Sequence, residues 1–398
     1  MADKRMRIAL VNQRYGLEVN GGSEYYTRML AEHLSEVCDV EILTTKALDY
    51  QTWDNYFEAD EEKVNGIVVR RFRTVHSRSP FKMKLYGKLR NVSSLAMRYS
   101  EERWVDAQGP CAPGLIQYIS DHVEDYSLFI FVTYLYYHTV RGIPKAKCRA
   151  VLLPTAHNEP YIHFAIYQKV FTSPVGLIYL TPEEKVLVES LFPVSQKPSC
   201  IIGTGIDLPD KVDSAVFRKK YGICRKYLIY VGRIDESKGC GEMFRIFLDY
   251  KRKYPDSELQ LILMGKTAMK IPESQDIEYL GFVSEQDKFD GISGAEALWL
   301  PSRYESLSLS VLESMALGTP VLVNGQCEVL KGHCERSGGG LSYVDDREAI
   351  SQLRLLEADV NRKEMSDNAR SYVRKNYRWD VVVNKINTFL QNLIVDST

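Results

Sequence analysis

The sequence predicts an α/β protein made of two doubly wound domains, and three observations support this fold class. The chain has 398 residues, which is long for a single hydrophobic core. Its apolar content of 45% is that of a soluble globular protein. Short apolar runs alternate with helix-like segments in two successive series, a pattern typical of mostly parallel sheets covered by helices on both faces.

The first series predicts an N-terminal domain at residues 1–195. Its expected strands are short apolar runs, at residues 7–11, 40–43, 67–72, 128–132, 151–153 and 175–180. A helix with Met29, Leu30 and Leu34 at helical spacing follows the first of these runs. Residues 193–209 combine prolines and glycines with one short strand and indicate a linker after this series.

The second series predicts another domain of the same kind at residues 196–378. Its expected strands are again short apolar runs, at residues 227–231, 259–264, 277–280, 297–300 and 321–323. The helix expected after Gly239 carries Met243, Phe247 and Tyr250 on one face. The segment 379–398 is amphipathic and is expected to form a terminal helix, for which packing back onto the first domain is one open arrangement.

Composition excludes several classes of protein. The 51 basic and 52 acidic residues nearly balance, which argues against nucleic acid as a partner. No apolar run reaches signal-peptide or membrane-spanning length, so we expect a cytoplasmic protein whose membrane contact, if any, is peripheral. The eight cysteines form no CxxC pair, which is typical of reduced thiols. Cys327, His333 and Cys334 match no usual zinc spacing, so no metal site is expected.

The stretch from Pro301 to Val323 combines a helix N-terminus with two carboxylates. A short helix is expected to begin at about Ser308, with Glu305 and Glu313 on either side of its start. Free backbone N–H groups at a helix N-terminus favour a phosphate ligand. Ionised carboxylates accept hydrogen bonds from hydroxyl groups. A nucleotide-diphosphate sugar carries both kinds of group and is the ligand that this stretch favours.

Two further loops follow expected strands. Gly21 and Gly22 open the first helix, where paired glycines let a backbone approach a ligand, although an ordinary flexible turn explains them equally well. Arg233 and Lys238, in VGRIDESKG, can converge on one phosphate group. A solvated surface loop would explain these two cations if Glu305 and Glu313 did not follow another strand of the same domain.

VGRIDESKG and PSRYESLSLSVLESMALGTPVLV together resemble the donor-binding half of retaining glycosyltransferases of family 4, which have the GT-B fold. GGSEYYTRMLAEHL, IIGTGIDL and LGFVSEQD extend the resemblance over most of the chain. It implies two Rossmann-like domains facing each other across a cleft, with residues 1–195 binding the acceptor and residues 196–378 binding a UDP- or GDP-sugar donor.

The resemblance also implies a role for each residue of the site. Arg233 and Lys238 would hold the donor diphosphate, Glu313 the ribose hydroxyls and Glu305 the hydroxyls of the transferred sugar. The remaining donor-binding residues that it implies are Gly21, Gly22, Phe282, Val283, Ser306, Leu307, Ser308 and Leu309. The usual family pattern has a phenylalanine and a glycine after the first glutamate, whereas this chain has Ser306-Leu307-Ser308, which puts donor identity in question.

His157 is the expected catalytic partner of Glu305, because it follows a strand of the first domain where the family often places a histidine near the donor sugar. The alternative is that His157 is a structural histidine in a loop. His163 is the other candidate for the catalytic role. The departing phosphate would take the acceptor proton, so Glu159 is not required as a base. Cations and helix dipoles can balance the diphosphate, so transfer without metal or other cofactor is expected.

The segment Lys63 to Arg103 holds eleven basic residues and two acidic ones. It forms either a solvated basic face or a dock on anionic lipid, and we favour the dock because the segment lies in the acceptor-side domain. The expected function is hexosyl transfer to a cell-surface glycan or lipid-linked saccharide. The alternatives are a non-catalytic sugar-nucleotide-binding scaffold and an epimerase on the same architecture; a phosphorylase is less favoured because the chain is short.

Overall fold

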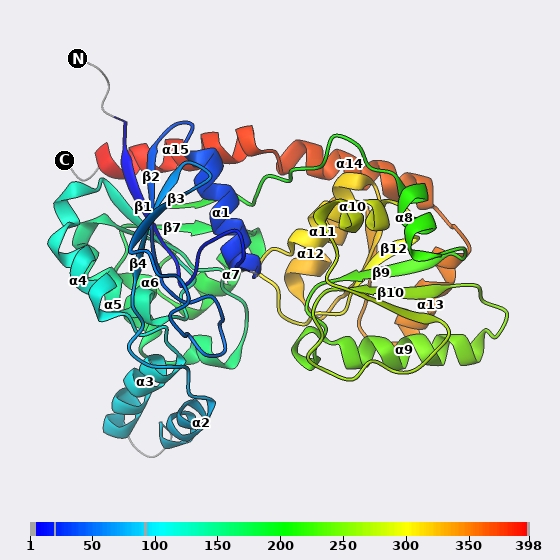
Figure 1. Ribbon diagram of the computed structural model, residues 1–398, viewed down its shortest axis with the longest axis horizontal. Helices are drawn as coiled ribbons and strands as arrows, with labels where there is room; N and C mark the ends of the chain where they lie inside the picture. The colour runs from blue at the N-terminus through cyan, green and yellow to red at the C-terminus, as the bar shows by residue number, and fades with distance from the viewer. Residues whose placement is uncertain (1–4, 20, 91–93, 396–398) are drawn as a thin grey trace. The chain divides into compact units, whose positions relative to one another are not determined.

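The structure, a computed structural model, describes residues 5–19, 21–90 and 94–395, so positions 91–93 of the basic segment and 396–398 of the terminal segment lie outside the described residues. The chain forms two compact units (Figure 1). Unit 1 contains the chain up to Thr204 together with the segment that begins at Trp379, and unit 2 is Gly205–Arg378. Each unit contains a mostly or wholly parallel sheet with helices, which confirms the predicted fold class.

The sheet of unit 1 has the strand order β3-β4-β2-β1-β5-β6-β7-β8 and is parallel except for the β3–β4 pair. Its strands are β1 (Arg7–Val11), β2 (Asp39–Thr45), β3 (Glu61–Val64), β4 (Ile67–Phe72), β5 (Leu128–Val132), β6 (Ala150–Leu153), β7 (Gly176–Tyr179) and β8 (Ser199–Ile201). Strand β3 was not predicted, because this edge strand reads EEKV and has no apolar run.

The helices of unit 1 include the C-terminal one. They are α1 (Gly22–Leu34), α2 (Pro80–Leu89), α3 (Ser94–Gln108), α4 (Pro113–Asp121), α5 (Tyr137–Ala146), α6 (Tyr167–Thr172), α7 (Pro182–Leu191) and α15 (Trp379–Val395). In α15, Trp379 stacks on His33 of α1 with ring centroids 4.2 Å apart, and Leu393 packs over Gly176 of β7. Helix α15 therefore covers part of the first sheet.

The sheet of unit 2 is wholly parallel, with the strand order β11-β10-β9-β12-β13-β14. Its strands are β9 (Tyr227–Val231), β10 (Gln260–Met264), β11 (Ile277–Gly281), β12 (Ala297–Leu300), β13 (Val321–Asn324) and β14 (Gly340–Tyr343). Its helices are α8 (Ser214–Tyr221), α9 (Cys240–Lys253), α10 (Glu285–Ser293), α11 (Leu309–Leu317), α12 (Glu328–Ser337), α13 (Asp346–Glu357) and α14 (Arg362–Asn376).

The strand order of unit 2 reverses between β9 and β12. The chain moves outward from β9 through β10 to β11, returns to the other side of β9 at β12, and continues through β13 to β14. Ligands of open α/β sheets bind outside the carboxyl ends of the strands, at such a reversal of the strand order. The loops after β9 and β12 are those that contain Lys238 and Glu305.

No helix in the described part of the chain is both long enough and apolar enough to cross a lipid bilayer.

The close packing of α15 on β7 yields a test of this fold. A Cβ added at Gly176 would lie 2.7 Å from Leu393 Cδ1 and 2.9 Å from Phe389 Cζ. Gly176→Ala should therefore lower the free energy of unfolding by about 1–3 kcal/mol, as measured by chemical denaturation. Gly87→Ala is the matched control, because a Cβ at Gly87 in α2 meets nothing within 4 Å. The control should be stabilised by about 0.5–1 kcal/mol, and equal stability of the two variants would contradict the packing.

Candidate functional site

The loops that follow β9 and β12 pack directly on each other. Gly239, at the end of the first loop, has a φ of 77°, and a Cβ there would lie 2.6 Å from the carbonyl oxygen of Pro301 in the second loop. Only glycine adopts this conformation at this distance without displacing the neighbouring backbone. The contact holds the two loops together at the point where the strand order reverses.

Across this contact, Lys238 forms an ion pair with Glu305. Lys238 Nζ lies 2.7 Å from Glu305 Oε1, and both side chains are partly buried. The ammonium group has three N–H donors and Glu305 takes one of them, so the lysine remains able to donate to a ligand. Two residues that are 67 positions apart in the sequence thus form one charged group where the strand order reverses.

Arg233 lies in the same loop but is bound locally. Its guanidinium group pairs with Asp235 and donates to Ser237 Oγ over 3.1 Å. Asp235 Oδ1 also accepts from the backbone N–H of Lys238, which caps the short 3₁₀ turn at Glu236–Lys238. Burial raises the pKa of Asp235, but the hydrogen bonds from Ser237 and Arg233 outweigh it and hold the pKa below its ordinary value. The predicted convergence of Arg233 and Lys238 on one phosphate stays a prediction.

Glu313 forms a second ion pair with a lysine, Lys288. It lies in α11 and is buried, and its Oε1 accepts from Nζ of Lys288 in α10 over 2.8 Å. Burial raises the pKa of Glu313, and the nearby Lys288 charge opposes that rise. A carboxylate buried beside a single cation keeps a strong tendency to accept further hydrogen bonds.

The two glutamates share one arrangement. Each binds a lysine through Oε1, and the Oε2 atom of each makes no hydrogen bond with the described part of the chain. An ionised carboxylate has about four lone-pair positions. Glu305 and Glu313 are therefore both prepared to accept hydrogen bonds from hydroxyl groups.

Ser308 caps α11 in a strained conformation. Its φ of 69° and ψ of 86° lie in the left-handed region, which costs a residue other than glycine about 1–2 kcal/mol. The side chain is 8% exposed, and its hydroxyl has no hydrogen-bond partner in the described part of the chain; the same holds for Ser302, in the same loop. A buried hydroxyl without a partner and a strained backbone at one residue are typical of a ligand site.

His333 binds the backbone of this loop through a hydrogen bond. Its Nε2 donates to the carbonyl oxygen of Leu307 over 2.8 Å, and its Nδ1 accepts from the hydroxyl of Tyr372 over 3.1 Å. Burial lowers the pKa of His333 to about 4, although its hydrogen bond to Leu307 opposes the shift. The histidine is therefore neutral and holds the backbone between Glu305 and Ser308 in place.

The other predicted donor-binding residues of unit 2 lie around these pairs. Ser306 is half-buried in the loop, and Leu309 begins α11. Phe282 and Val283 follow β11, and the Phe282 side chain is 69% exposed. An exposed aromatic ring beyond a strand end has a free face on which a nucleotide base can stack.

In unit 1, Gly21 and Gly22 lie where α1 begins, after β1. Gly21 has a φ of 155°, and a Cβ there would lie 2.2 Å from Glu24 Oε2, so glycine is required. Glu24 is buried in an ion pair with Arg14, whose Nε lies 2.9 Å from Glu24 Oε1. Sequence reasoning missed Arg14, because nothing in the local pattern shows that it is buried.

His157 follows β6 and is half-buried. Its Nε2 lies 3.6 Å from Glu159 Oε2, and Glu159 Oε1 accepts from the hydroxyl of Tyr134 over 2.6 Å. Buried Glu184 accepts from the backbone N–H of Ala156 over 2.6 Å and so anchors the residue before the histidine. His157 thus belongs to a polar network in unit 1, and its approach to a donor sugar stays a prediction.

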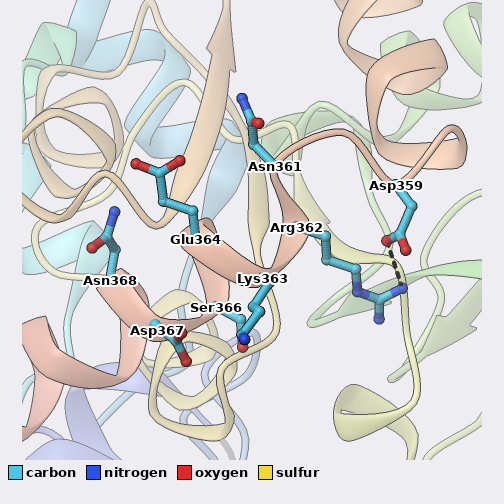
Figure 2. A pocket seen from close by; sticks show the side chains of 8 residues that line it. All are labelled: Asp359, Asn361, Arg362, Lys363, Glu364, Ser366, Asp367 and Asn368. Atoms are coloured by element: carbon cyan, nitrogen blue, oxygen red, sulfur yellow. Dashed lines mark ion pairs between the residues drawn. The ribbon is translucent and has the colours of Figure 1, made fainter.

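A surface pocket of unit 2 lies around the first turns of α14, and Figure 2 shows it from close by. Its lining residues are Asp359, Asn361, Arg362, Lys363, Glu364, Ser366, Asp367 and Asn368. Arg362 is held by an ion pair with Glu296 and lies 3.7 Å from Asp359. None of the predicted site residues lines this pocket, so we do not assign it to the candidate site.

Lys288 and His333 of unit 2 contact the site but were not among the site residues predicted from the sequence. Lys288 lies in α10, just beyond LGFVSEQD, and its pairing with α11 depends on how these two helices pack. His333 stood out only as a neighbour of two cysteines, but it binds backbone and tyrosine instead. Within the described ranges, no group of three or more His, Cys, Asp or Glu side chains is placed to hold a metal ion.

The chain is similar to known proteins in both sequence and structure. Residues 225–353 match the family model of glycosyl transferases group 1. An uncharacterized glycosyltransferase of Methanocaldococcus jannaschii is 23% identical over 94% of this chain and 95% of its own length. A GDP-mannose-dependent monoacylated alpha-(1-6)-phosphatidylinositol monomannoside mannosyltransferase of Corynebacterium glutamicum is 22% identical over 45% of this chain and 51% of its own length. The solved structure of Anabaena HepE in complex with UDP-glucose has a TM-score of 0.68 and 15% identity, covering 97% of this chain and 100% of that chain.

The fold and the sequence matches together define the class: the protein is a glycosyltransferase of the GT-B type. Within that class, the segment of unit 2 from just before β9 into α13 is the part that matches the group 1 glycosyl transferases. The predicted family resemblance is confirmed at this level.

The strain and the unpartnered hydroxyl at Ser308 yield a stability test. Ser308→Ala removes the buried hydroxyl and should raise the free energy of unfolding by about 1 kcal/mol. Ser308→Gly also removes the left-handed strain and should be about 1 kcal/mol more stable than the alanine variant. Chemical denaturation of the ligand-free protein measures both values. An alanine variant less stable than the parent protein would show that the hydroxyl has a partner.

Buried His333 should make stability depend on pH. Its folded pKa of about 4 lies below the ordinary value of 6.5, so the unfolded state binds more protons between these values. The contribution of His333 is fully present above pH 6.5 and is lost as pH falls toward 4, by about 3 kcal/mol.

Unfolding free energies of the parent and His333→Gln proteins, measured from pH 7 to pH 4.5, would test this dependence. The parent should lose more stability than the variant as the pH falls. His138, whose pKa burial also lowers to about 4, is present in both proteins and cancels in the comparison. Parallel stability curves for the two proteins would contradict the expected pKa.

Proposed function

We propose that the protein is a retaining glycosyltransferase. It moves a hexose-type sugar from a UDP- or GDP-sugar to a cell-surface glycan or a lipid-linked saccharide, without a metal ion. The observation that carries this proposal is the pair of glutamates in unit 2, each bound to a lysine through one carboxylate oxygen and prepared to accept through the other. Glu313 takes the ribose hydroxyls, and Glu305 takes hydroxyls of the transferred sugar.

Positive charge around the donor diphosphate comes from the chain itself. Lys238 keeps N–H donors beyond the one that Glu305 takes, and Arg233 lies in the same loop. The N-terminus of α11, at Ser308 and Leu309, adds backbone N–H groups and the positive end of the helix dipole. Together these groups balance the charge on the leaving diphosphate, which is the task that Mg²⁺ performs in other transferases.

The transfer step follows from this charge balance. The bond between the anomeric carbon and the diphosphate oxygen breaks, and the nucleoside diphosphate leaves with the bonding electrons. The acceptor hydroxyl forms its bond on the same face of the sugar, and its proton passes to the departing phosphate oxygen. Lys238 and the helix N-terminus stabilise the negative charge that develops on that oxygen.

Unit 1 supplies the acceptor side in this proposal. Gly21 and Gly22 present backbone N–H groups at the start of α1, and His157 stabilises charge at the reacting sugar. A lipid-linked acceptor is supported by the Corynebacterium relative, whose name gives a phosphatidylinositol mannoside as its substrate and GDP-mannose as its donor.

The nucleotide of the donor is proposed to be either UDP or GDP. HepE was solved with UDP-glucose and supports a UDP-sugar as much as the Corynebacterium relative supports a GDP-sugar. The proposed location is the cytoplasmic face of the plasma membrane.

Turnover of a donor panel tests the proposal. We expect one UDP- or GDP-hexose to be bound and slowly hydrolysed in the presence of EDTA, with mass spectrometry detecting the released sugar. Glu305→Gln should lower kcat/KM for that donor by about 10–100-fold, because it removes the charge from a hydrogen bond to the sugar. Lys238→Met should lower it at least as much, because the leaving diphosphate loses a cation.

Glu278→Gln is the matched control, since Glu278 is an exposed carboxylate on β11 with no ion pair in the described part of the chain, and it should leave turnover unchanged. Donor binding without hydrolysis or transfer would favour the scaffold alternative. Interconversion of the donor sugar would favour an epimerase. A protein that binds no UDP-, GDP- or ADP-sugar would refute the proposal.

A further inference from the structure

Helix α2 of unit 1 is attached to the protein along one side only. Met83 and Tyr86 pack against the hydrophobic core of unit 1. Arg90, just after the helix, lies 3.2 Å from Glu101 of the neighbouring α3, which joins the two helices at that end. Figure 1 shows α2 beside α3, away from the strands of unit 1. The opposite side of α2 contacts no described part of the chain closely enough to bury a residue.

That opposite side carries an apolar stripe. Phe81, Leu85 and Leu89 follow one another at intervals of four residues, which places them along one face of the helix. Their exposed fractions are 78%, 42% and 39%, respectively. Three large apolar side chains exposed in one row on a short helix are costly in water, and such rows mark interaction surfaces.

Lysines flank the stripe on both sides. At 3.6 residues per turn, Lys82 falls on one side of the row while Lys84 and Lys88 fall on the other. All three are exposed, and none of them forms an ion pair with a described residue. Helix α2 contains no acidic residue. Its outer face, defined by these three lysines with Phe81, Leu85 and Leu89, is therefore apolar along the middle and cationic along both edges.

The structure separates this face from the rest of the basic segment. Arg70 pairs with Glu41 and Glu61, and Arg71 is buried in a pair with Glu62. These arginines stabilise the edge of the sheet and are not available to a partner. The structure thus removes Arg70 and Arg71 from the predicted basic dock between residues 63 and 103, and it leaves the lysines of α2 exposed.

We propose that the outer face of α2 docks on an anionic lipid bilayer. Phe81, Leu85 and Leu89 enter the boundary between headgroups and acyl chains, and the three lysines bind anionic headgroups on either side. A narrow apolar row between cations, without a single acidic residue, is the pattern of an interfacial helix. Docking would hold unit 1 at the membrane surface; that this brings a lipid-linked acceptor within reach rests on the proposed function.

Vesicle binding by the full-length chain tests the proposal. We expect co-sedimentation with vesicles of phosphatidylcholine containing 30% phosphatidylglycerol, and little with phosphatidylcholine alone. Phe81→Ser should weaken the partition coefficient at least tenfold by removing the most exposed apolar side chain. The triple variant K82Q/K84Q/K88Q should weaken the partition coefficient on the order of 100-fold, at about fivefold per lysine. Raising the salt concentration should also weaken vesicle binding by the parent protein.

A matched control lies on another exposed helix. Val216→Ser with Lys219→Gln, on α8 of unit 2, removes an exposed apolar side chain and an exposed lysine and should leave vesicle binding unchanged. All variants should melt near the temperature of the parent protein, because the altered side chains are exposed. Phe81→Trp should retain binding and show a blue shift of its fluorescence when anionic vesicles are added.

Three outcomes would overturn the proposal: no binding of the parent protein to anionic vesicles, equal binding to neutral and anionic vesicles, or equal binding by the parent, Phe81→Ser and triple-lysine proteins. Donor hydrolysis in solution should be the same for Phe81→Ser and the parent. Failure of vesicle binding with intact hydrolysis would therefore refute the docking surface alone. Loss of donor turnover with intact vesicle binding would refute the proposed function alone.

Discussion

The ion pair between Lys238 and Glu305 is the contact on which the candidate site depends. It joins the loops after β9 and β12, and Gly239 beside it lets the first loop approach the backbone of Pro301. The parallel sheet brings these loops together, since its strand order reverses between β9 and β12. A charge pair at such a point is already desolvated in part, so a charged and hydroxyl-rich ligand can replace water there at little further cost.

Residues around that ion pair are held in energetically unfavourable positions. Glu313 is buried beside Lys288, and Ser308 is in a left-handed conformation with a hydroxyl that finds no partner in the described residues. These features destabilise the ligand-free loop, and neutral His333 holds the loop in place through the Leu307 carbonyl. A site that is kept strained by its surroundings is prepared for a ligand before the ligand arrives.

The charges of unit 1 perform two different tasks. Arg70 and Arg71 satisfy carboxylates at the sheet edge, and Arg14 does the same for Glu24 at the start of α1. The lysines of α2 have no such partners among the described residues, although they belong to the same basic stretch of sequence. The count of basic residues does not distinguish these cations, because it does not show which face of a helix or strand each one occupies. Only packing separates cations that stabilise the fold from cations that remain available to a surface.

The sequence by itself determined the α/β class, most of the strands and the glutamate, lysine and glycine motifs, because apolar periodicity and turn residues act over a few positions. Two strands were not predicted: β3, whose charged residues carry no apolar pattern, and β14, whose sequence GLSY has no apolar run. Tertiary structure alone decided that Lys238 meets Glu305, that Lys288 meets Glu313, and that His333 binds the loop instead of a metal. These contacts join residues that lie 25 to 67 positions apart. Their distances are set by sheet order and helix packing, which no local pattern encodes.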